Sequence, residues 1–430
     1  MKLGCIADDF TGATDVANNL VRAGMRVVQT IGVPADRTPV QADAVVVALK
    51  SRTTPADQAV RDSLAACQWL RSLAPAGQAP QIYFKYCSTF DSTPQGNIGP
   101  VAEALMDELD TPFTIATPAF PDNGRSVFKG HLFVGDTLLS ESSMRHHPLT
   151  PMTDANLVRV LQAQCKRRVG LVEHRVVDAG PEAIRRRFAQ LRQEGVGIAI
   201  VDAIDNRALL TLGQATADLP LVTAGSGLAI GLPPQWGFAP NETAQRLPKA
   251  SGAKAVLAGS CSAATQRQVQ SFVQAGLPAL ALDPLRIAQG EDVVAQALAW
   301  AQAQLAQGGP VLVYSTADAQ AVQSVQAQLG TQQAGEMVEH TLAAIANGLA
   351  SLGVRQLIVA GGETSGACVQ ALGIERMQIG PQIDPGVPWC HARSAAIGGQ
   401  GLHLTLKSGN FGSDDFFVKA FDILAAMQAA

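Results

Sequence analysis

Apolar and polar positions along the first half of the chain alternate in an order that predicts strands separated by helices. Residues 2–7 form a short apolar run typical of a buried strand, and from Thr11 to Ala23 the apolar residues recur at helical spacing. The order continues with strands expected at 26–33, 44–50, 81–86, 113–120, 169–174, 197–203 and 220–232, and helices at 55–73, 98–109, 181–194 and 206–217. Strands that alternate with helices pair as parallel neighbours, so the pattern predicts a mainly parallel α/β sheet.

One segment departs from this order. Residues 126–141, SVFKGHLFVGDTLLSE, contain two alternating runs around Gly135-Asp136, which is a signal for a β-hairpin. We expect this insertion to form a flap or an interface arm, and a homodimer is one assembly that such an arm would allow.

Residues 232–253 are rich in proline, alanine and polar residues and break the periodicity, so we place a domain boundary there. A second α/β series follows, with helices expected at 263–275, 285–307, 414–428 and twice within 317–352. Residues 379–412 read as extended segments joined by glycine-rich turns. The prediction is therefore two α/β domains with mainly parallel sheets, residues 1–240 with a hairpin insertion and residues 254–430.

Composition excludes several classes of function. The 430 residues carry a formal charge of −4 without a cluster of lysine or arginine, so no nucleic-acid footprint is expected. The amino terminus reaches two aspartates before a signal-peptide core, and no apolar run is long enough to cross a membrane, which predicts a cytoplasmic protein. Seven cysteines without a Cys-x-x-Cys pair indicate reduced thiols rather than disulfides or structural zinc.

Glycine loops follow or precede strands of the second domain. In Gln356–Ala371 the backbone N–H groups of Gly361, Gly362, Glu363 and Thr364 are expected where a buried strand ends and a helix begins, a position that binds anions. An ordinary strand-to-helix turn would have the same sequence. Ser260 after the strand at 253–258, and Gly401 in a third loop, suggest one shared nucleotide site. Neither a P-loop nor a G-x-G-x-x-G motif is present, so any nucleotide would be held by a less common cradle.

The first domain carries charged side chains at its own strand ends. Asp8 and Asp9 follow the first strand, while Arg52, Lys85, Asp91 and Arg125 follow later strands or precede the hairpin. Arg52 with Lys85 or Arg125 is suited to hold a carboxylate, and an aspartate can accept a proton from a hydroxyl, which together fit a small polyhydroxy acid. Taken singly, each basic residue is also explained as solvated surface. We assign the base to Asp8 or Asp9, with the other capping the next helix, and name Asp91 as the next candidate.

Three other features point elsewhere. A strand followed by Asp-x-Asp-x-Thr marks haloacid dehalogenase phosphatases, but Asp8 and Asp9 are adjacent, so the second aspartate is misplaced. His131, His146 and His147 lack the spacing of a metal site. The Gly225–Gly227 turn is either an anion site or a helix cap.

Six long motifs resemble the four-carbon acid sugar kinase family across essentially the whole chain. They are IADDFTGATDVA at 6–17, KYCSTFDSTPQGNIGP at 85–100, PAFPDNGRSVFKGHLFV at 118–134, HPLTPMTD at 147–154, TAGSGLA at 223–229 and AGGETSGA at 360–367. GHLFV followed by HPLTPMTD most resembles the 3-oxo-tetronate kinases, which phosphorylate the terminal hydroxyl of a 3-oxo four-carbon sugar acid.

The resemblance implies that the first domain holds the acid sugar and the second holds ATP. It implies ATP contacts at Ser260, at residues 361–364 and near Gly401, and acceptor contacts at Asp8, Asp9, Arg52, Lys85 and Asp91. Such a reaction uses Mg²⁺, for which the sequence does not identify ligands. Members differ in acceptor, so threonate or erythronate remains an alternative. A sugar-phosphate phosphatase and a sensor that binds sugar acids without turnover are the competing classes.

Overall fold

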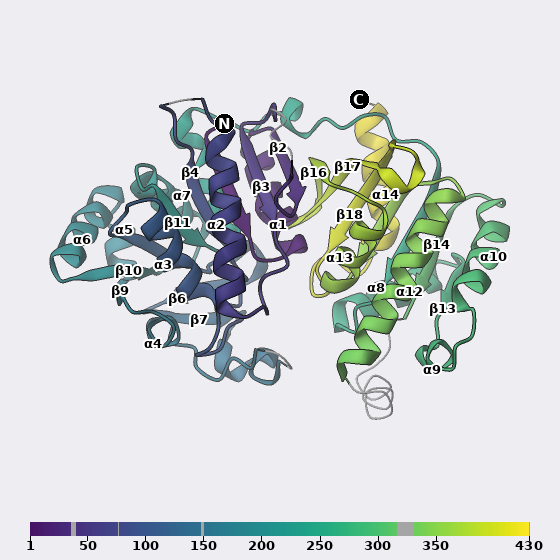
Figure 1. The fold of residues 1–430 in the computed structure, drawn as a ribbon, viewed down its shortest axis with the longest axis horizontal. Coiled ribbons are helices and arrows are strands. Elements are labelled where there is room, and N and C mark those ends of the chain that lie inside the picture. The colour runs from purple at the N-terminus through teal and green to yellow at the C-terminus, as the bar shows by residue number, and fades with distance from the viewer. Residues whose placement is uncertain (36–39, 76, 148–149, 316–330, 430) are drawn as a thin grey trace. The chain divides into compact units, whose positions relative to one another are not determined.

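The chain folds into two compact units, Met1–Gln245 and Arg246–Ala430 (Figure 1). The computed structural model describes residues 1–35, 40–75, 77–147, 150–315 and 331–429. The unit boundary lies within the 232–253 segment in which the periodicity breaks. The first of the two helices expected within 317–352, and residues 148–149 of the motif at 147–154, lie outside the described residues.

Unit 1 is built on a sheet in which every described strand pair is parallel. The strand order is β2-β3-β1-β4-β11-β5-β10-β9. The strands are β1 (Leu3–Ala7), β2 (Val27–Ile31), β3 (Ala44–Ala48), β4 (Gln81–Lys85), β5 (Thr114–Thr117), β9 (Arg168–Val172), β10 (Val196–Val201) and β11 (Leu221–Ala224). Because the strands are parallel, their carboxyl ends share one edge of the sheet.

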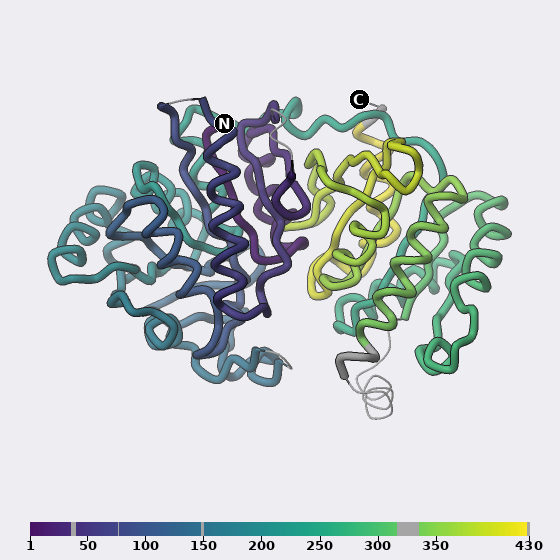
Figure 2. The backbone as a smooth tube through the Cα atoms, in the orientation of Figure 1, coloured from purple at the N-terminus to yellow at the C-terminus, as the bar shows by residue number. Residues whose placement is uncertain are grey.

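Helices cover both faces of this sheet. They are α1 (Phe10–Arg22), α2 (Ala56–Ser72), α3 (Ile98–Glu108), α4 (Leu157–Gln162), α5 (His174–Asp178), α6 (Pro181–Gln193) and α7 (Asn206–Thr216), with short 3-10 turns η1 (Pro121–Asn123), η2 (Leu139–Glu141), η3 (Ser143–His146), η4 (Gly227–Gly231), η5 (Pro233–Trp236) and η6 (Glu242–Gln245). The path from β1 through α1 to β2 and the path from β3 through α2 to β4 run in opposite directions along the sheet. The colours of the tube in Figure 2 follow the chain through these elements from the N-terminus. Right-handed crossovers therefore place α1 and α2 on opposite faces. The strand order reverses at β1, which is where open α/β sheets bind ligands.

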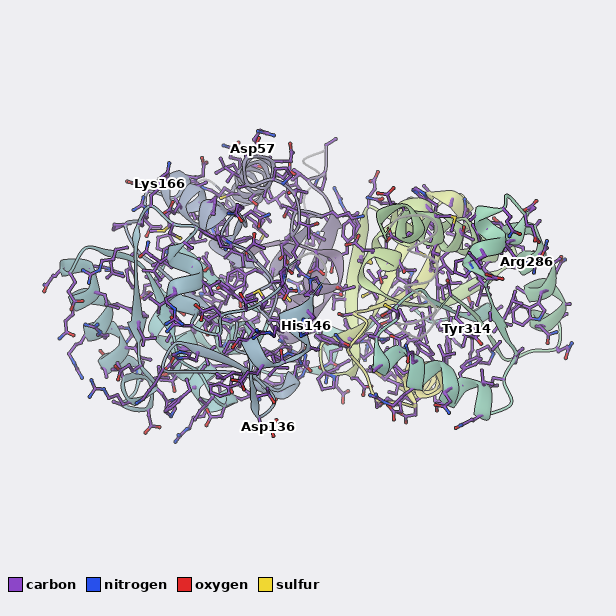
Figure 3. The ribbon with its side chains drawn as sticks, turned by 90° about the horizontal axis from the view of Figure 1, so that it is seen from below. Asp57, Asp136, His146, Lys166, Arg286 and Tyr314 are labelled. Carbon is purple, nitrogen blue, oxygen red and sulfur yellow. The ribbon has the colours of Figure 1, made fainter. Side chains whose placement is uncertain are left out.

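The inserted segment has one more turn than the sequence predicts. Three antiparallel strands, β6 (Arg125–Phe128), β7 (His131–Val134) and β8 (Thr137–Leu138), form it. The predicted turn at Gly135-Asp136 joins β7 to β8, and Asp136 is labelled in Figure 3. The sequence pattern reads the residues before Gly135 as one strand, but a second turn at Lys129-Gly130 divides them into β6 and β7. This turn is held by the Asp202 carboxylate, which accepts the Lys129 and Gly130 N–H groups at 2.7 and 2.8 Å.

Unit 2 combines a parallel sheet with an antiparallel extension. Its strand order is β13-β14-β12-β15-β18-β17-β16. Neighbours among β13, β14, β12, β15 and β18 pair in parallel, whereas β17 pairs antiparallel with both β18 and β16. The strands are β12 (Ala253–Ala258), β13 (Ala279–Ala281), β14 (Pro310–Tyr314), β15 (Val354–Ala360), β16 (Arg376–Asp384), β17 (Val387–Ser394) and β18 (Gln400–Lys407). Tyr314, at the carboxyl end of β14, is labelled in Figure 3.

The helices of unit 2 are α8 (Ala263–Gln274), α9 (Pro284–Ala288), α10 (Val293–Leu305), α12 (Thr331–Ser351), α13 (Gly362–Ala371) and α14 (Phe416–Ala429), with the 3-10 turn η7 (Ala395–Ile397). The single helix expected at 285–307 is two helices, because Gly290 adopts a φ of +79° and Asp292 caps a new helix by accepting Ala295 N–H at 2.9 Å. The core is anchored by the buried Trp389, whose Nε1 donates to the Ala420 carbonyl at 2.8 Å.

Candidate active site

A buried carboxylate and a guanidinium lock two strand ends of unit 1 together. Asp8 directly follows β1 and is 4% exposed, and Arg52 follows the neighbouring β3. Arg52 Nε and Nη2 each donate to Asp8 carboxylate oxygens at 2.8 Å, a two-point fork that fixes both side chains. Burial raises the pKa of Asp8 above its ordinary value, and the adjacent Arg52 charge opposes this rise.

Asp9 is the cap of α1. Its carboxylate accepts Gly12 N–H at 2.9 Å and the Thr11 hydroxyl at 2.8 Å, and Arg52 Nη2 donates to it at 2.6 Å. Burial opposes ionisation, but the charges of Arg52 and Lys85 and these hydrogen bonds outweigh it and lower the pKa of Asp9 to about 2. Asp9 is thus an ionised, fully engaged helix cap.

Lys85 reaches the same point from the other side of β1. It ends β4, where it is level with Ala7, and its Nζ lies 3.6 Å from Asp9 Oδ1. Its side chain is only 4% exposed. A Cβ on Gly12 would stand 1.8 Å from Lys85 Nζ, so the ammonium occupies the space that the glycine leaves open in the first turn of α1. The structure therefore brings Asp8, Asp9, Arg52 and Lys85 together.

Asp91 lies beside this group on the loop after β4. It is 9% exposed, and the Thr89 hydroxyl donates to its Oδ1 at 2.6 Å. The Cys87 thiol lies close enough to Asp91, Arg52 and Lys85 to be affected by all three charges. Burial, followed by the charge of Asp91, raises the pKa of Cys87 to about 12, while Arg52 and Lys85 act in the opposite direction. A cavity of about 170 Å³ adjoins this loop and is lined by Ser92, Thr93, Pro94, Pro151, Met152, Thr153, Asp154, Arg159, Val160 and Ala163.

Arg125 opens β6, and a carboxylate that the sequence did not single out faces the same charges. Arg125 Nη1 donates to the Asn123 carbonyl, whereas its Nε is buried without a partner in the described residues. Asp15, in the second turn of α1, is 4% exposed, and its Oδ2 accepts the Ser226 hydroxyl. Ser226 belongs to the Gly225–Gly227 turn, and Asn19 Nδ2 donates to its carbonyl at 2.8 Å. In the sequence Asp15 lies about one turn after Gly12 in the helix expected from Thr11 to Ala23, and the structure shows that α1 is buried almost all round.

In unit 2, two strand ends form a cradle of backbone. Gly259-Ser260 follows β12, and Gly361 follows the adjacent β15 with a φ of +127°, a conformation that favours glycine. A Cβ on Gly361 would stand 2.9 Å from Thr364 Oγ1 and 3.3 Å from Ser260 N. Gly362, Glu363 and Thr364 form the first turn of α13, and the first N–H groups of a helix point out of its amino end. This corner has the form of an anion cradle.

The third predicted loop is wrong in position. Gly401 lies near the start of β18, opposite Arg393 of β17, whereas Gly361 is level with the end of β18, since Ala360 pairs with Lys407. The antiparallel extension brings the chain back along the sheet, so the loop before β18 lies at the edge opposite the cradle. Gly409, after β18, takes its place: a Cβ there would stand 2.4 Å from Ser260 Oγ.

A buried lysine shapes the loop around Gly409. Lys407 Nζ donates to the carbonyls of Ser408 and Gly409 at 3.0 Å each and of Phe411 at 3.2 Å, and to Thr265 Oγ1 at 3.1 Å. The side chain is fully buried, and burial lowers the pKa of Lys407 to about 7. Lys407 therefore fixes the loop from within.

His131 Nδ1 contacts the Lys129 carbonyl, and His147 Nδ1 contacts Thr150, while His146, labelled in Figure 3, ends η3. Within the described ranges, no group of three or more histidine, cysteine, aspartate or glutamate residues is arranged to hold a metal ion.

Comparisons with known proteins cover nearly the whole chain. The family model described as a sugar-binding N-terminal domain matches residues 3–232, and the one described as a nucleotide-binding C-terminal domain matches residues 255–417. A 3-oxo-tetronate kinase of Pseudomonas fluorescens is 57% identical over 99% of this chain and 98% of its own. One of Burkholderia multivorans is 58% identical over 98% and 97%. A crystal structure of a Salmonella typhimurium protein, 46% identical, has a TM-score of 0.86 and covers 97% of this chain and 98% of its own.

Proposed function

The chain belongs to the four-carbon acid sugar kinase family, and on this premise we propose that it transfers the γ-phosphoryl group of ATP to the 4-hydroxyl of a 3-oxo-tetronate. The observation that carries the proposal is the similarity, over nearly the full length, to relatives that bear the name 3-oxo-tetronate kinase. The products are the 4-phosphate of the sugar acid and ADP.

Unit 1, in this proposal, holds the acceptor. Among the described residues Arg125 Nε is buried without a partner, and Lys85 has an ammonium at the edge of the sheet; both are donors suited to a carboxylate and its neighbouring oxygens. Asp91 is placed to accept from hydroxyls. Arg52 is already bound by Asp8 and Asp9, so it contributes by holding these carboxylates and presenting its remaining N–H groups. The assignment of the base to Asp8 or Asp9 stays a prediction.

Unit 2, in this proposal, holds ATP. The cradle of Ser260, Gly361, Gly362, Glu363 and Thr364 fits a phosphate because the glycines allow close approach and the first turn of α13 supplies N–H groups. We add Gly409 and remove Gly401. Mg²⁺ bound to ATP usually takes phosphate oxygens, water and only one or two carboxylates, so a cage of protein ligands is not required. When bound, it neutralises charge on the phosphates.

No helix in the described part of the chain is long and apolar enough to cross a membrane. The cytoplasmic location and the homodimer stay predictions of the sequence. Size-exclusion chromatography with light scattering measures the second of these directly.

A coupled ADP-release assay tests the proposed function. ATP and Mg²⁺ are supplied with 3-oxo-tetronates, threonate or erythronate, and the expected result is the highest kcat/KM with a 3-oxo-tetronate. A preference for threonate or erythronate would correct the acceptor and leave the reaction class intact. Phosphate release from a sugar phosphate without ATP would favour a phosphatase, and acceptor binding without turnover would favour a sensor.

A further inference from the structure

Asp15 is a buried carboxylate of which one oxygen lacks a hydrogen-bond partner among the described residues. Oδ2 accepts the Ser226 hydroxyl, while Oδ1 is buried without a hydrogen-bond partner in the described residues. A buried, unsatisfied carboxylate oxygen costs free energy, so a group that supplies a donor is expected to bind there. An incoming hydroxyl is such a donor.

The charges around Asp15 come from separate elements that meet at the same edge of the sheet. Lys85 from β4, Arg125 from β6 and Asp9 from the start of α1 all act on its ionisation, and the Tyr83 phenol lies near enough to be affected by it. Gly12, one turn earlier on α1, is the residue over which Lys85 Nζ lies. Asp15 therefore belongs to the same polar group as the acceptor residues proposed above.

The two aspartates after β1 are less suited to take a proton. Asp8 is held in a two-point fork by Arg52, and Asp9 accepts from Thr11, Gly12 and Arg52 at once. Both oxygens of Asp8 are therefore already occupied, and the donors to Asp9 keep its pKa low. Asp15 differs from both because one of its oxygens is not engaged.

We propose that Asp15 is the catalytic base of the reaction, with Oδ1 accepting the proton of the attacking acceptor hydroxyl. The inference rests on the proposed function. The hydroxyl O–H bond breaks and its proton moves to Asp15 Oδ1, while the oxygen forms a bond to the γ-phosphorus of ATP. The bond from that phosphorus to the β,γ-bridging oxygen breaks, and the electron pair leaves with ADP. Ser226 is a positioning residue that holds the other carboxylate oxygen.

The environment gives Asp15 a suitable basicity. Burial raises the pKa of Asp15 to about 7, with the Lys85 charge and the Ser226 hydrogen bond acting against this rise. A general base works best when its pKa lies near the working pH. By contrast, the pKa of Asp9 is lowered to about 2, which makes it a poor proton acceptor.

The test compares Asp15→Asn with Ser226→Ala and Asp202→Asn in the full-length protein. Asparagine keeps the shape and still accepts the Ser226 hydroxyl, so folding should survive. Asp202 is a matched control: its carboxylate is also buried with a raised pKa, but it binds backbone N–H groups of the inserted segment. The readouts are kcat and kcat/KM against pH with a 3-oxo-tetronate, ATP binding by a fluorescent analogue, and the thermal midpoint.

We expect Asp15→Asn to lower kcat by about two to four decades while ATP binding is retained. In the wild type, kcat/KM should fall as the pH is lowered through about 7, and this acid limb should be absent from Asp15→Asn. Ser226→Ala should move that acid limb to higher pH, because the hydrogen bond it removes lowers the pKa of Asp15. Asp202→Asn should keep the limb in place even if its thermal midpoint falls.

The result that overturns the assignment is an active wild type in which Asp15→Asn keeps its kcat and its acid limb. The same loss in Asp202→Asn as in Asp15→Asn would also overturn it, since a structural effect would then explain both. If Asp15→Asn does not fold, an unmoved acid limb in Ser226→Ala refutes the assignment. A wild type that does not consume ATP with any acceptor would instead refute the proposed function, and the inference would fall with it.

Discussion

Replacing Gly12 by alanine should separate activity from stability. The new Cβ would lie 1.8 Å from Lys85 Nζ and 2.2 Å from Asp9 Oδ1, distances that heavy atoms not bonded to each other do not tolerate. Both atoms are at the ends of side chains rather than in the backbone. We therefore expect the ammonium and the carboxylate to move while α1 keeps its place.

Gly12→Ala should have two opposing effects on stability, whereas its expected effect on activity is a loss. Alanine in place of glycine within a helix stabilises by about 1 kcal/mol, and weakening the Asp9 cap costs about 1 kcal/mol, so the two nearly cancel. A hydrogen bond to a charged group contributes about 1.5–3 kcal/mol, which is about one to two decades if Lys85 no longer reaches the acceptor. For a domain of this size, 1 kcal/mol shifts the thermal midpoint by only about 2–4 °C.

The assay is ADP release with the acceptor varied at saturating ATP, alongside thermal unfolding. Gly335→Ala is a matched control, because Gly335 also lies within a helix, α12, and the one contact of a Cβ there among the described residues is Glu339 Oε1 at 3.9 Å. The control should keep full activity. If Gly12→Ala retains the wild-type kcat/KM for the acceptor, the position of the Lys85 ammonium is not used. A loss of several kcal/mol in stability would show instead that the backbone had moved.

Three further predictions follow from the described contacts. Arg52→Ala should cost about 3–5 kcal/mol of unfolding free energy because it strands the Asp8 and Asp9 charges, and Arg52→Lys should recover only part of it, as denaturant titration would show. Gly409→Ala should raise the KM for ATP and leave the acceptor KM unchanged, because its Cβ displaces Ser260 Oγ; equal effects on both in steady-state kinetics would contradict this. Lys407 has a pKa of about 7 when folded and 10.5 ordinarily, so the unfolded chain binds more protons in that interval and stability should rise with pH across it. Lys407→Met should flatten the rise of the unfolding free energy with pH, as measured by urea titrations at several pH values. An unchanged slope of unfolding free energy against pH would show that Lys407 is not its cause.

Strand-end reasoning predicted which charged side chains of unit 1 lie together, because its premises are encoded locally. Asp8, Arg52 and Lys85 each follow an apolar run, and the alternation with helices makes those runs parallel. Parallel strands end at one edge, so the side chains that follow them meet. No knowledge of the rotamers was needed to place these three residues together.

The same reasoning failed at Gly401 and missed Asp15, for different physical reasons. Hydrophobic periodicity does not state the direction of a strand, and the antiparallel turn between β17 and β18 moved Gly401 to the opposite edge. Asp15 lies inside a helix, where the sequence shows which residues share a face but not which group that face meets. Only the packing of Ser226, from more than two hundred residues later, identifies it.

The charges of the unit 1 site constrain how it can recognise an anionic acceptor. Three carboxylates and three cations surround the proposed site and formally cancel, before Asp15 is counted: Asp8, Asp9, Asp91, Arg52, Lys85 and Arg125. Ionised Asp15 makes the total negative, so net attraction cannot select a sugar acid. On the proposed function, selection instead comes from hydrogen-bond donors at the site, for which the buried Arg125 Nε is a candidate. In the proposed complex, the acceptor brings a further negative charge towards Asp15 and raises its pKa again.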